Sequence, residues 1–285
     1  MIDFFKKSAV WAFATISAVF TFVPEAFFGK ITWIPDSVLK QCKWIEKNIL
    51  EVNIIITRVM AFLAIWILAS IVYRAYLDIR RKVTINGNNY KIIVEYGDLL
   101  KTKKCKRVIN FDECFTTQVG EYPADIKPSS ICGKYLIANP NLDMKSLITN
   151  SHLKPAKSKS KYQNKIRYES GRIVPNGDDL LMAFAKLDED GLGRLSRDEF
   201  LECLSILWKE IDKYYCQKDV CIPILGAGLT RIDGDSGSYI SQQELLDMII
   251  WSYKLSSSKI KAPHKLRIIC KKCDDFSINK IDSQV

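Results

Sequence analysis

The chain has 285 residues, a net charge of +10 at pH 7 and 48% hydrophobic residues, so one or two domains with a sizeable core are expected. This composition excludes a disordered or fibrous chain. Nine cysteines, an odd number without disulfide-like spacing, favour a reducing compartment over a secreted, disulfide-stapled domain.

Two long apolar runs lie within the first 75 residues. Residues 9–23 carry no charge and can extend to residue 28, while residues 54–73 contain only one charge, Arg58. About twenty apolar residues span a hydrocarbon core of about 30 Å. The runs therefore predict two transmembrane helices, over about 8–28 and 54–73, in a membrane region of residues 1–81. A signal peptide is the alternative for the first run, although no small-x-small cleavage site follows it.

The flanking charges predict the orientation of this membrane hairpin. Basic residues precede the first run at positions 6 and 7 and follow the second run at positions 74 and 80–82, whereas the lysines between the runs are diluted by acids. By the positive-inside rule both ends of the hairpin are expected in the cytoplasm. Arg58 either snorkels to the headgroups or marks a functional site, and its role stays open.

Residues 82–285 are expected to form one soluble domain that begins with a hairpin. The dipeptide Asn86-Gly87 lies between two β-rich runs and predicts a type I′ turn. Residues 107–110 read as a buried strand. Residues 110–117 would then be a loop at the carboxyl end of that strand, where open α/β sheets place ligands.

The middle of the domain combines a basic loop with an imitation of a calcium site. Residues 146–167 are rich in Lys and Ser and predict a solvated loop, with a patch for lipid headgroups or nucleic acid as the alternative. Asn176-Gly177 predicts a second hairpin. Residues 188–199 are spaced like a calcium loop, but Leu192 supplies no oxygen at the fifth position. Ser196 and Glu199 favour a helix-capping box instead.

The rest of the chain predicts helices and strands in alternation. Helices are expected over residues 197–214 and 241–255, and strands over residues 220–225 and 266–270. Short apolar strands between helices imply an α/β fold whose sheet is at least partly parallel. Cys270 and Cys273 form a CxxC, but no second pair or nearby His completes a metal site, so no metal is predicted.

A loop with glycines at Gly226 and Gly228 follows the predicted strand over residues 220–225. Its exposed N–H groups suit a phosphate or pyrophosphate, because two positions lack a Cβ that would keep a ligand away. No Lys-Ser/Thr follows as in a P-loop, and Arg231 stands where a dinucleotide fingerprint has its third glycine. A plain turn that ends a buried strand is the alternative.

Several short segments, taken together, resemble a known family. They are Gly97-Asp98-Leu99, Tyr168-x-x-Gly171, and residues 108–117, 207–212, 222–231, 243–246 and 249–252. On these segments the chain resembles macro domains, and specifically the divergent macro-domain family found in Thoeris antiviral defence effectors. The resemblance covers roughly residues 83–280, and two preceding membrane spans match one architecture of these effectors. The expected fold is α/β, a macro-domain-like mixed sheet between helices preceded by a two-helix transmembrane hairpin.

The resemblance implies a ligand-binding domain, residues 82–285, with a pocket for ADP-ribose or a derivative. At the adenine end it implies Gly97, Asp98 and Leu99, with the Asp98 carboxylate accepting the adenine amino group. The loop around the diphosphate would comprise Leu225, Gly226, Ala227, Gly228, Leu229, Thr230 and Arg231. The residues near the distal ribose would be Asn110, Phe115 and Thr116. The usual asparagine and glycine-rich loop of macro domains is absent there, which argues against hydrolase activity.

The function that the resemblance implies is that of a signal receptor. A companion TIR-domain enzyme would consume NAD and make an ADP-ribose-type signal, and the macro domain would bind it without a catalytic residue, metal or cofactor. Binding would associate several copies of the chain in the bacterial inner membrane, disrupt the lipid bilayer and kill or arrest the cell. No nucleic acid partner is expected. A membrane-bound ADP-ribosyl hydrolase is the alternative, and a calcium sensor is a third hypothesis.

Overall fold

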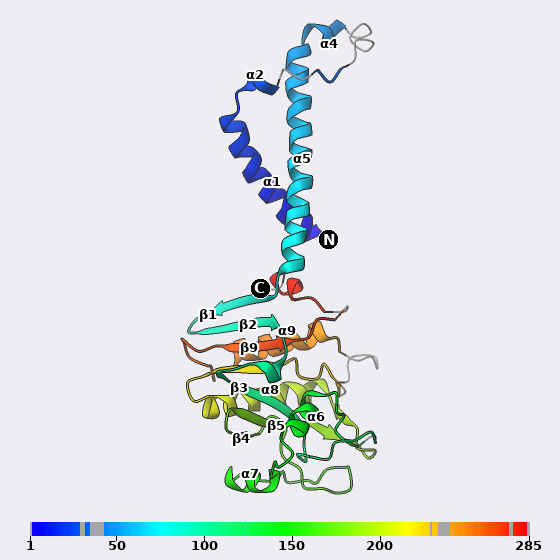
Figure 1. The fold of residues 1–285 in the computed structure, drawn as a ribbon, viewed down its shortest axis with the longest axis vertical. Coiled ribbons are helices and arrows are strands. Elements are labelled where there is room, and N and C mark those ends of the chain that lie inside the picture. Colours follow the sequence, from blue (N-terminus) through cyan, green and yellow to red (C-terminus); the bar gives the residue numbers. More distant parts are fainter. Residues whose placement is uncertain are drawn as a thin grey trace. The chain divides into compact units, whose positions relative to one another are not determined.

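The computed structural model describes residues 2–28, 32–34, 43–122, 124–228, 230–232, 240–273 and 276–283. The chain divides into two compact units, residues 1–80 and residues 81–285 (Figure 1). Among the described residues the first unit is helical, and the second contains a mixed β-sheet with helices.

The first unit contains two long helices that pack antiparallel, and two short ones. Its helices are α1 (Ile2–Phe22), α2 (Glu25–Phe28), α4 (Lys43–Lys47) and α5 (Ile49–Ile79). The Trp66 indole N–H donates to Ser8 Oγ at 3.3 Å, and the Arg58 guanidinium lies 5.7 Å from the centre of the Phe20 ring. Because rising numbers in α1 meet falling numbers in α5, the two helices run in opposite directions.

The structure alters both predicted spans. The run expected as one helix over 8–28 breaks before Pro24, since proline has no N–H to continue the helical hydrogen bonds. Helix α5 has 31 residues, more than the predicted 54–73, and is about 46 Å long at 1.5 Å per residue. Within the described residues α5 is the one helix long and apolar enough to cross a membrane, and the apolar part of α1, Ser8–Phe22, is shorter.

The second unit is built on one mixed sheet. Its strands are β1 (Lys82–Gly87), β2 (Tyr90–Tyr96), β3 (Cys105–Asp112), β4 (Ile173–Asn176), β5 (Asp179–Leu187), β6 (Gly193–Leu195), β7 (Asp219–Pro223), β8 (Arg231–Ile232) and β9 (Leu266–Cys270). The order across the sheet is β1-β2-β9-β7-β3-β5-β6-β8, with β4 also pairing with β5. Strands β2, β9, β7, β3 and β5 run parallel, which confirms the predicted α/β class.

Helices cover both faces of this sheet. The helical elements are η1 (Leu99–Lys101), α6 (Ile131–Ala138), α7 (Met144–Asn150), α8 (Arg197–Tyr214), α9 (Gln242–Leu255) and η3 (Ile278–Ser283). Helices α8 and α9 pack on one face, where Trp208 and Tyr253 meet edge to face at 5.0 Å between ring centres. Turn η1 and helices α6 and α7 pack on the other face. The ligand loops expected from the sequence therefore lie at the end of a sheet that is buried on both sides.

Most predicted elements are present, with shifted ends. Helix α8, strand β9 and both capping boxes agree with the prediction, including the cap of α9 by Ser241. The first hairpin turns at residues 88–89, because Gly87 belongs to β1 and pairs with Tyr90. The second turns at residues 177–178, because Asn176 pairs with Asp179.

The predicted boundaries of two loops and one strand were wrong. Residues 110–112 belong to β3 and are not part of the loop predicted over 110–117. Residues 146–150 form most of α7 and are not part of the basic loop. Strand β7 ends at Pro223, two residues earlier than predicted, so Ile224 and Leu225 already belong to the turn.

A substitution at Gly171, just before β4, tests how closely the backbone packs against α8. Its φ is +95°, and an added Cβ would lie 2.4 Å from the Cys203 carbonyl oxygen. Replacing Gly171 by Ala should lower the free energy of unfolding by about 2–4 kcal/mol, because left-handed strain and overpacking add. The matched control is Gly177→Ala, whose φ is +61° but whose Cβ would have open space, so about 1 kcal/mol is expected. Equal losses in urea unfolding of the two variants would contradict the predicted contact.

Candidate functional site

Three of the predicted ligand segments meet at one edge of the sheet. Strands β2, β3 and β7 run parallel within it, and their carboxyl ends lead into residues 97–98, 113–117 and 224–228. The carboxyl edge of a parallel sheet is where α/β folds bind ligands. The sequence thus places these segments together although more than a hundred residues separate the first from the last.

The first segment is a fixed turn with an exposed acid. The Gly97 N–H donates to the Cys270 carbonyl at 2.9 Å, which ties the end of β2 to β9. Asp98 caps η1, and its Oδ1 accepts the Leu100 N–H at 3.1 Å. Leu99 is buried in the core beneath, whereas the Asp98 side chain is exposed. The acid is therefore available to a ligand while its backbone is anchored.

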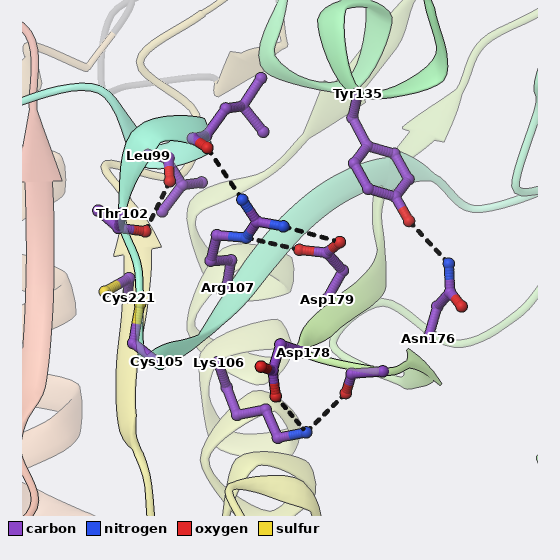
Figure 2. A network of polar contacts seen from close by, with 12 residues as sticks. Leu99, Thr102, Cys105, Lys106, Arg107, Tyr135, Asn176, Asp178, Asp179 and Cys221 are labelled. Carbon is purple, nitrogen blue, oxygen red and sulfur yellow. Dashed lines mark hydrogen bonds and ion pairs between the residues drawn. The ribbon is translucent and has the colours of Figure 1, made fainter. Parts of the chain in front are cut away.

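An arginine on β3 holds this turn from below. Figure 2 shows Arg107 pointing toward Asp179 on β5, and the distances from Arg107 Nε and Nη2 to the two carboxylate oxygens are 2.7 and 3.0 Å. The Arg107 Nη1 atom donates to the Leu100 carbonyl at 2.9 Å. Because the guanidinium is planar and bidentate, the position of η1 is fixed relative to two central strands.

Two buried acids that the sequence did not single out, Asp112 and Glu113, lie where β3 leads into the second segment. The carboxylate of Asp112 accepts the N–H groups of Cys114 at 2.8 Å and Thr116 at 3.1 Å, which folds the chain back after β3. Burial raises the pKa of the Asp112 carboxyl, and the hydrogen bonds from Thr116 and Cys114 oppose that rise. Asp112 therefore acts as a structural acceptor for this loop.

Glu113 connects this loop to distant parts of the chain. Its Oε1 accepts from Ser160 Oγ at 2.6 Å and from the Leu187 N–H at 3.2 Å, and its Oε2 pairs with Arg167 at 3.1 Å. Its own carbonyl accepts the Tyr168 N–H at 2.7 Å. Arg167 of the basic loop therefore forms an ion pair with a buried carboxylate. Neither the solvated loop nor the patch for lipid headgroups or nucleic acid predicted this contact.

The three residues predicted near the distal ribose, Asn110, Phe115 and Thr116, differ in how deeply they are buried. Asn110 lies half-buried within β3. Phe115 has a φ of +53°, and its side chain is buried 5.9 Å from the Phe111 ring and 5.5 Å from the Tyr168 ring. Thr116 is half-buried beside Asp112. The Phe115 side chain therefore belongs to the core, and its backbone is the part that faces the loop.

The glycine loop combines one constrained and one open glycine. Gly226 has a φ of +82°, and an added Cβ would lie 2.3 Å from Ile232 Cδ1. Gly228 is exposed, with nothing within 4 Å of such a Cβ. Leu225 is buried, whereas Ala227 and Thr230 are half-buried. Arg231 pairs through its backbone in β8, and Leu229 lies outside the described residues.

The calcium-like loop is occupied by the protein's own groups. Asp188 Oδ1 accepts the N–H groups of Asp190 and Leu192, and its Oδ2 pairs with Arg194 at 2.9 Å. Glu199 pairs with Lys186 at 2.7 Å. Strand β6, which the sequence did not predict, lies within this stretch and gives residues 193–195 an extended conformation. Over the described ranges, no group of three or more His, Cys, Asp or Glu residues could hold a metal ion.

Two pockets lie along α8, at a distance in sequence from the predicted ligand loops. One of about 620 Å³ is lined by the basic loop, Arg172 and the α8 residues Glu199 to Glu210, and one of about 780 Å³ lies between α8 and α9. In the first, the cations Arg172 and Lys186 are already paired with Glu210 and Glu199. His152, on the turn after α7, also lines the first pocket, whereas His264 precedes β9.

A mixed sheet of this order, covered on both faces and carrying an acid turn and a glycine loop at its carboxyl edge, defines a macro-domain-like fold. A family model described as "Thoeris protein ThsA, Macro domain" matches residues 92–271. The chain belongs to this family.

One curated protein and two solved structures are among those that this chain is similar to. Thoeris protein ThsA of Bacillus amyloliquefaciens (strain Y2) is 29% identical over 212 residues, which cover 69% of this chain and 68% of that protein. The Oceanobacillus iheyensis macrodomain with ADP has 10% identity and a TM-score of 0.44, over 72% of this chain and 98% of its own. The macrodomain of Thermus aquaticus DarG has 13% identity and a TM-score of 0.38, over 64% and 98%.

The raised pKa of the buried Asp112 carboxyl predicts a pH-dependent stability. Because its folded-state pKa is raised, the protonated carboxyl stabilises the fold below the unfolded value of about 3.9, and this contribution is lost as the pH rises through the folded value. At pH 7 Asp112→Asn should therefore be at least as stable as the parent. Asp112→Ala should be about 1–3 kcal/mol less stable, because two amide N–H groups lose their acceptor.

Thermal unfolding of the three proteins between pH 4 and pH 8 checks this order. The advantage of Asn over Asp should shrink as the pH falls. If the Asn variant is the least stable of the three at pH 7, the ionised carboxylate is required and the explanation is wrong.

Proposed function

We propose that this chain is a membrane-anchored effector of antiviral defence whose macro domain binds an ADP-ribose-derived signal. The observation that carries the proposal is the pairing, at one sheet edge, of the exposed Asp98 with the glycine loop at Gly226 and Gly228. Membership of the ThsA macro-domain family supports ADP-ribose as the ligand class.

The contacts proposed for the ligand follow from the chemistry of each segment. Asp98 accepts the adenine amino group, since its carboxylate offers lone pairs in addition to the one used by Leu100. The backbone around Gly226 and Gly228 surrounds the diphosphate, because Gly228 leaves open space beside it. Thr116 and the backbone of Phe115 lie toward the distal ribose. Residues 225 and 227–231 complete this loop, and Gly97, Leu99 and Asn110 position the other two.

Sensing, without catalysis, fits the acids of this edge best. A general acid or base must reach the substrate with its proton. Asp112 and Glu113 are both buried, and their oxygens accept hydrogen bonds from loop amides, Ser160 and Arg167. We therefore assign no catalytic residue, metal or cofactor. The hydrolase remains the competing function, and it is addressed by the assay below.

The membrane part of the proposal rests on α5 and its packing with α1. Helix α5 is long enough to cross a core of about 30 Å, and α1 runs antiparallel beside it. We propose that both helices insert in the bacterial inner membrane with the macro domain in the cytoplasm. A TIR-domain partner supplies the signal, bound copies associate, and their hairpins disrupt the bilayer and stop cell growth. Nucleic acid has no part in this function.

Calorimetry of the full-length protein in detergent with ADP-ribose tests the ligand. Binding is expected for the parent chain. Asp98→Ala should weaken it roughly 10- to 100-fold, since a hydrogen bond to a charged group contributes about 1.5–3 kcal/mol. The control is Asp143→Ala, which removes another exposed helix-capping aspartate on α7 and should leave the affinity unchanged.

Two results would contradict this assignment. Equal affinity of the Asp98→Ala variant and the parent would remove the adenine contact, and absence of binding by ADP-ribose and its derivatives would remove the ligand class. The same samples, incubated with an ADP-ribosylated protein, should release no ADP-ribose. Turnover would favour the hydrolase.

The cysteines allow a direct test of the orientation in the membrane. Cys42 lies between the two apolar runs, and Cys216 and Cys273 are exposed on the domain. A maleimide that cannot cross the inner membrane should label Cys42 in cells with a permeabilised outer membrane and leave the other two unlabelled until the cells are lysed. Cys42→Ser is the control. Labelling of Cys216 and Cys273 before lysis would reverse the orientation, and labelling of none would remove the hairpin.

A further inference from the structure

Two cysteine thiols meet in the core on the α6 face of the sheet. Cys105 is the first residue of β3, and Cys221 lies in the middle of β7. The Cys221 thiol donates to Cys105 Sγ, and the two sulfur atoms are 3.0 Å apart (Figure 2). Cys221 is 0% exposed and Cys105 is 2% exposed, so both thiols are inside the domain. The proposed receptor function uses neither thiol.

The surroundings favour a thiolate at Cys105. The hydrogen bond from Cys221, together with the Thr102 hydroxyl and the charges of Arg267 and Arg107, lowers the pKa of Cys105 below its usual value, against the effect of burial. The same hydrogen bond and burial raise the pKa of Cys221, which keeps it a thiol donor. A thiolate with a neighbouring thiol is the arrangement of redox-active dithiols.

Two other cysteines, the buried Cys270 and the half-buried Cys114, show that this environment is particular to the pair. Burial raises the pKa of Cys270 to about 12 and that of Cys114 to about 11. Both arginines near the pair are held in place by acids, Arg107 by Asp179 and Arg267 by Glu95 at 2.6 Å. The positive charge beside Cys105 is therefore a fixed part of the sheet.

We propose that Cys105 and Cys221 form a peroxide-sensitive dithiol that closes into a disulfide. The Cys105 thiolate attacks one oxygen of hydrogen peroxide, which gives a sulfenic acid and releases hydroxide. The Cys221 sulfur then attacks the sulfenic sulfur, the S–O bond breaks, and the Cys221 proton leaves with the hydroxyl as water. The peroxide takes up both electrons that the two sulfurs lose. Cys105 begins its strand, so opening of that end admits the small oxidant.

Closure of the disulfide must move the strand ends. The sulfurs have to approach from 3.0 Å to about 2.05 Å. In the sheet Cys105 pairs with Asp219, and Cys221 pairs with Arg107, so the two cysteines are offset by two residues. Turn η1 lies over them: Thr102, beside the pair, donates from Oγ1 to the Leu99 carbonyl at 2.7 Å. We therefore expect the oxidised pair to displace the turn that carries Asp98. If the proposed ligand site is correct, this displacement changes the affinity for ADP-ribose.

Peptide mapping of the full-length protein tests the dithiol directly. The reduced protein is treated with hydrogen peroxide, remaining thiols are blocked with N-ethylmaleimide, and peptic peptides are analysed by mass spectrometry. A peptide pair linked through Cys105 and Cys221 is the expected product, and dithiothreitol should abolish it. Recovery of both cysteines as blocked thiols, when exposed Cys216 and Cys273 have been oxidised, would overturn the proposal.

Two variants and one further measurement complete the experiment. Cys221→Ser should abolish the linked peptide, whereas Cys270→Ser, at another buried cysteine, should leave it. Linkage of Cys105 to a cysteine other than Cys221 in the parent protein would overturn the pairing, and the parent protein gives the decisive result even if a variant fails to fold. ADP-ribose affinity is measured before and after oxidation. Absence of binding in both states counts against the ligand site alone, because the linked peptide is scored independently.

Discussion

A buried carboxylate, that of Glu113, holds the carboxyl edge of the sheet together. An ionised acid in the interior is tolerated only when its oxygens are paired and hydrogen-bonded. Here the side chain meets that condition with Arg167 and Ser160 of the basic loop and with the Leu187 N–H at the end of β5. Loss of one partner leaves a charge in the core, so the loop after β3, the end of β5 and the basic loop have to fold as one.

Arg107 has the corresponding role near the start of β3. Its guanidinium joins Asp179 of β5 to the carbonyl of Leu100, and so a loop turn gains the rigidity of the central strands. Sites built on rigid elements hold their geometry better than sites on free loops. Asp98 and the loop after β3 are in this sense extensions of the sheet. In the described part of the glycine loop, Gly226 is constrained because Ile232 leaves no room for a side chain there.

The sequence predicted those features that repeat along the chain and missed those that depend on distant partners. Helix α8 was exact because its apolar residues recur at helical spacing between a capping box and a clear end. Turn positions were shifted because the Asn-Gly signal does not show that Gly87 packs under Tyr90. Helices α6 and α7 are too short for a periodic signal. Glu113 and Arg167 are 54 residues apart, and no local pattern connects them.

The join between the two units has a mechanical consequence. Helix α5 ends at Ile79 and β1 begins at Lys82, so only Arg80 and Arg81 connect them. Three virtual bonds of extended chain reach about 10 Å. A connection of this length bounds the separation between the last residue of α5 and the first residue of β1, whatever the orientation of the two units.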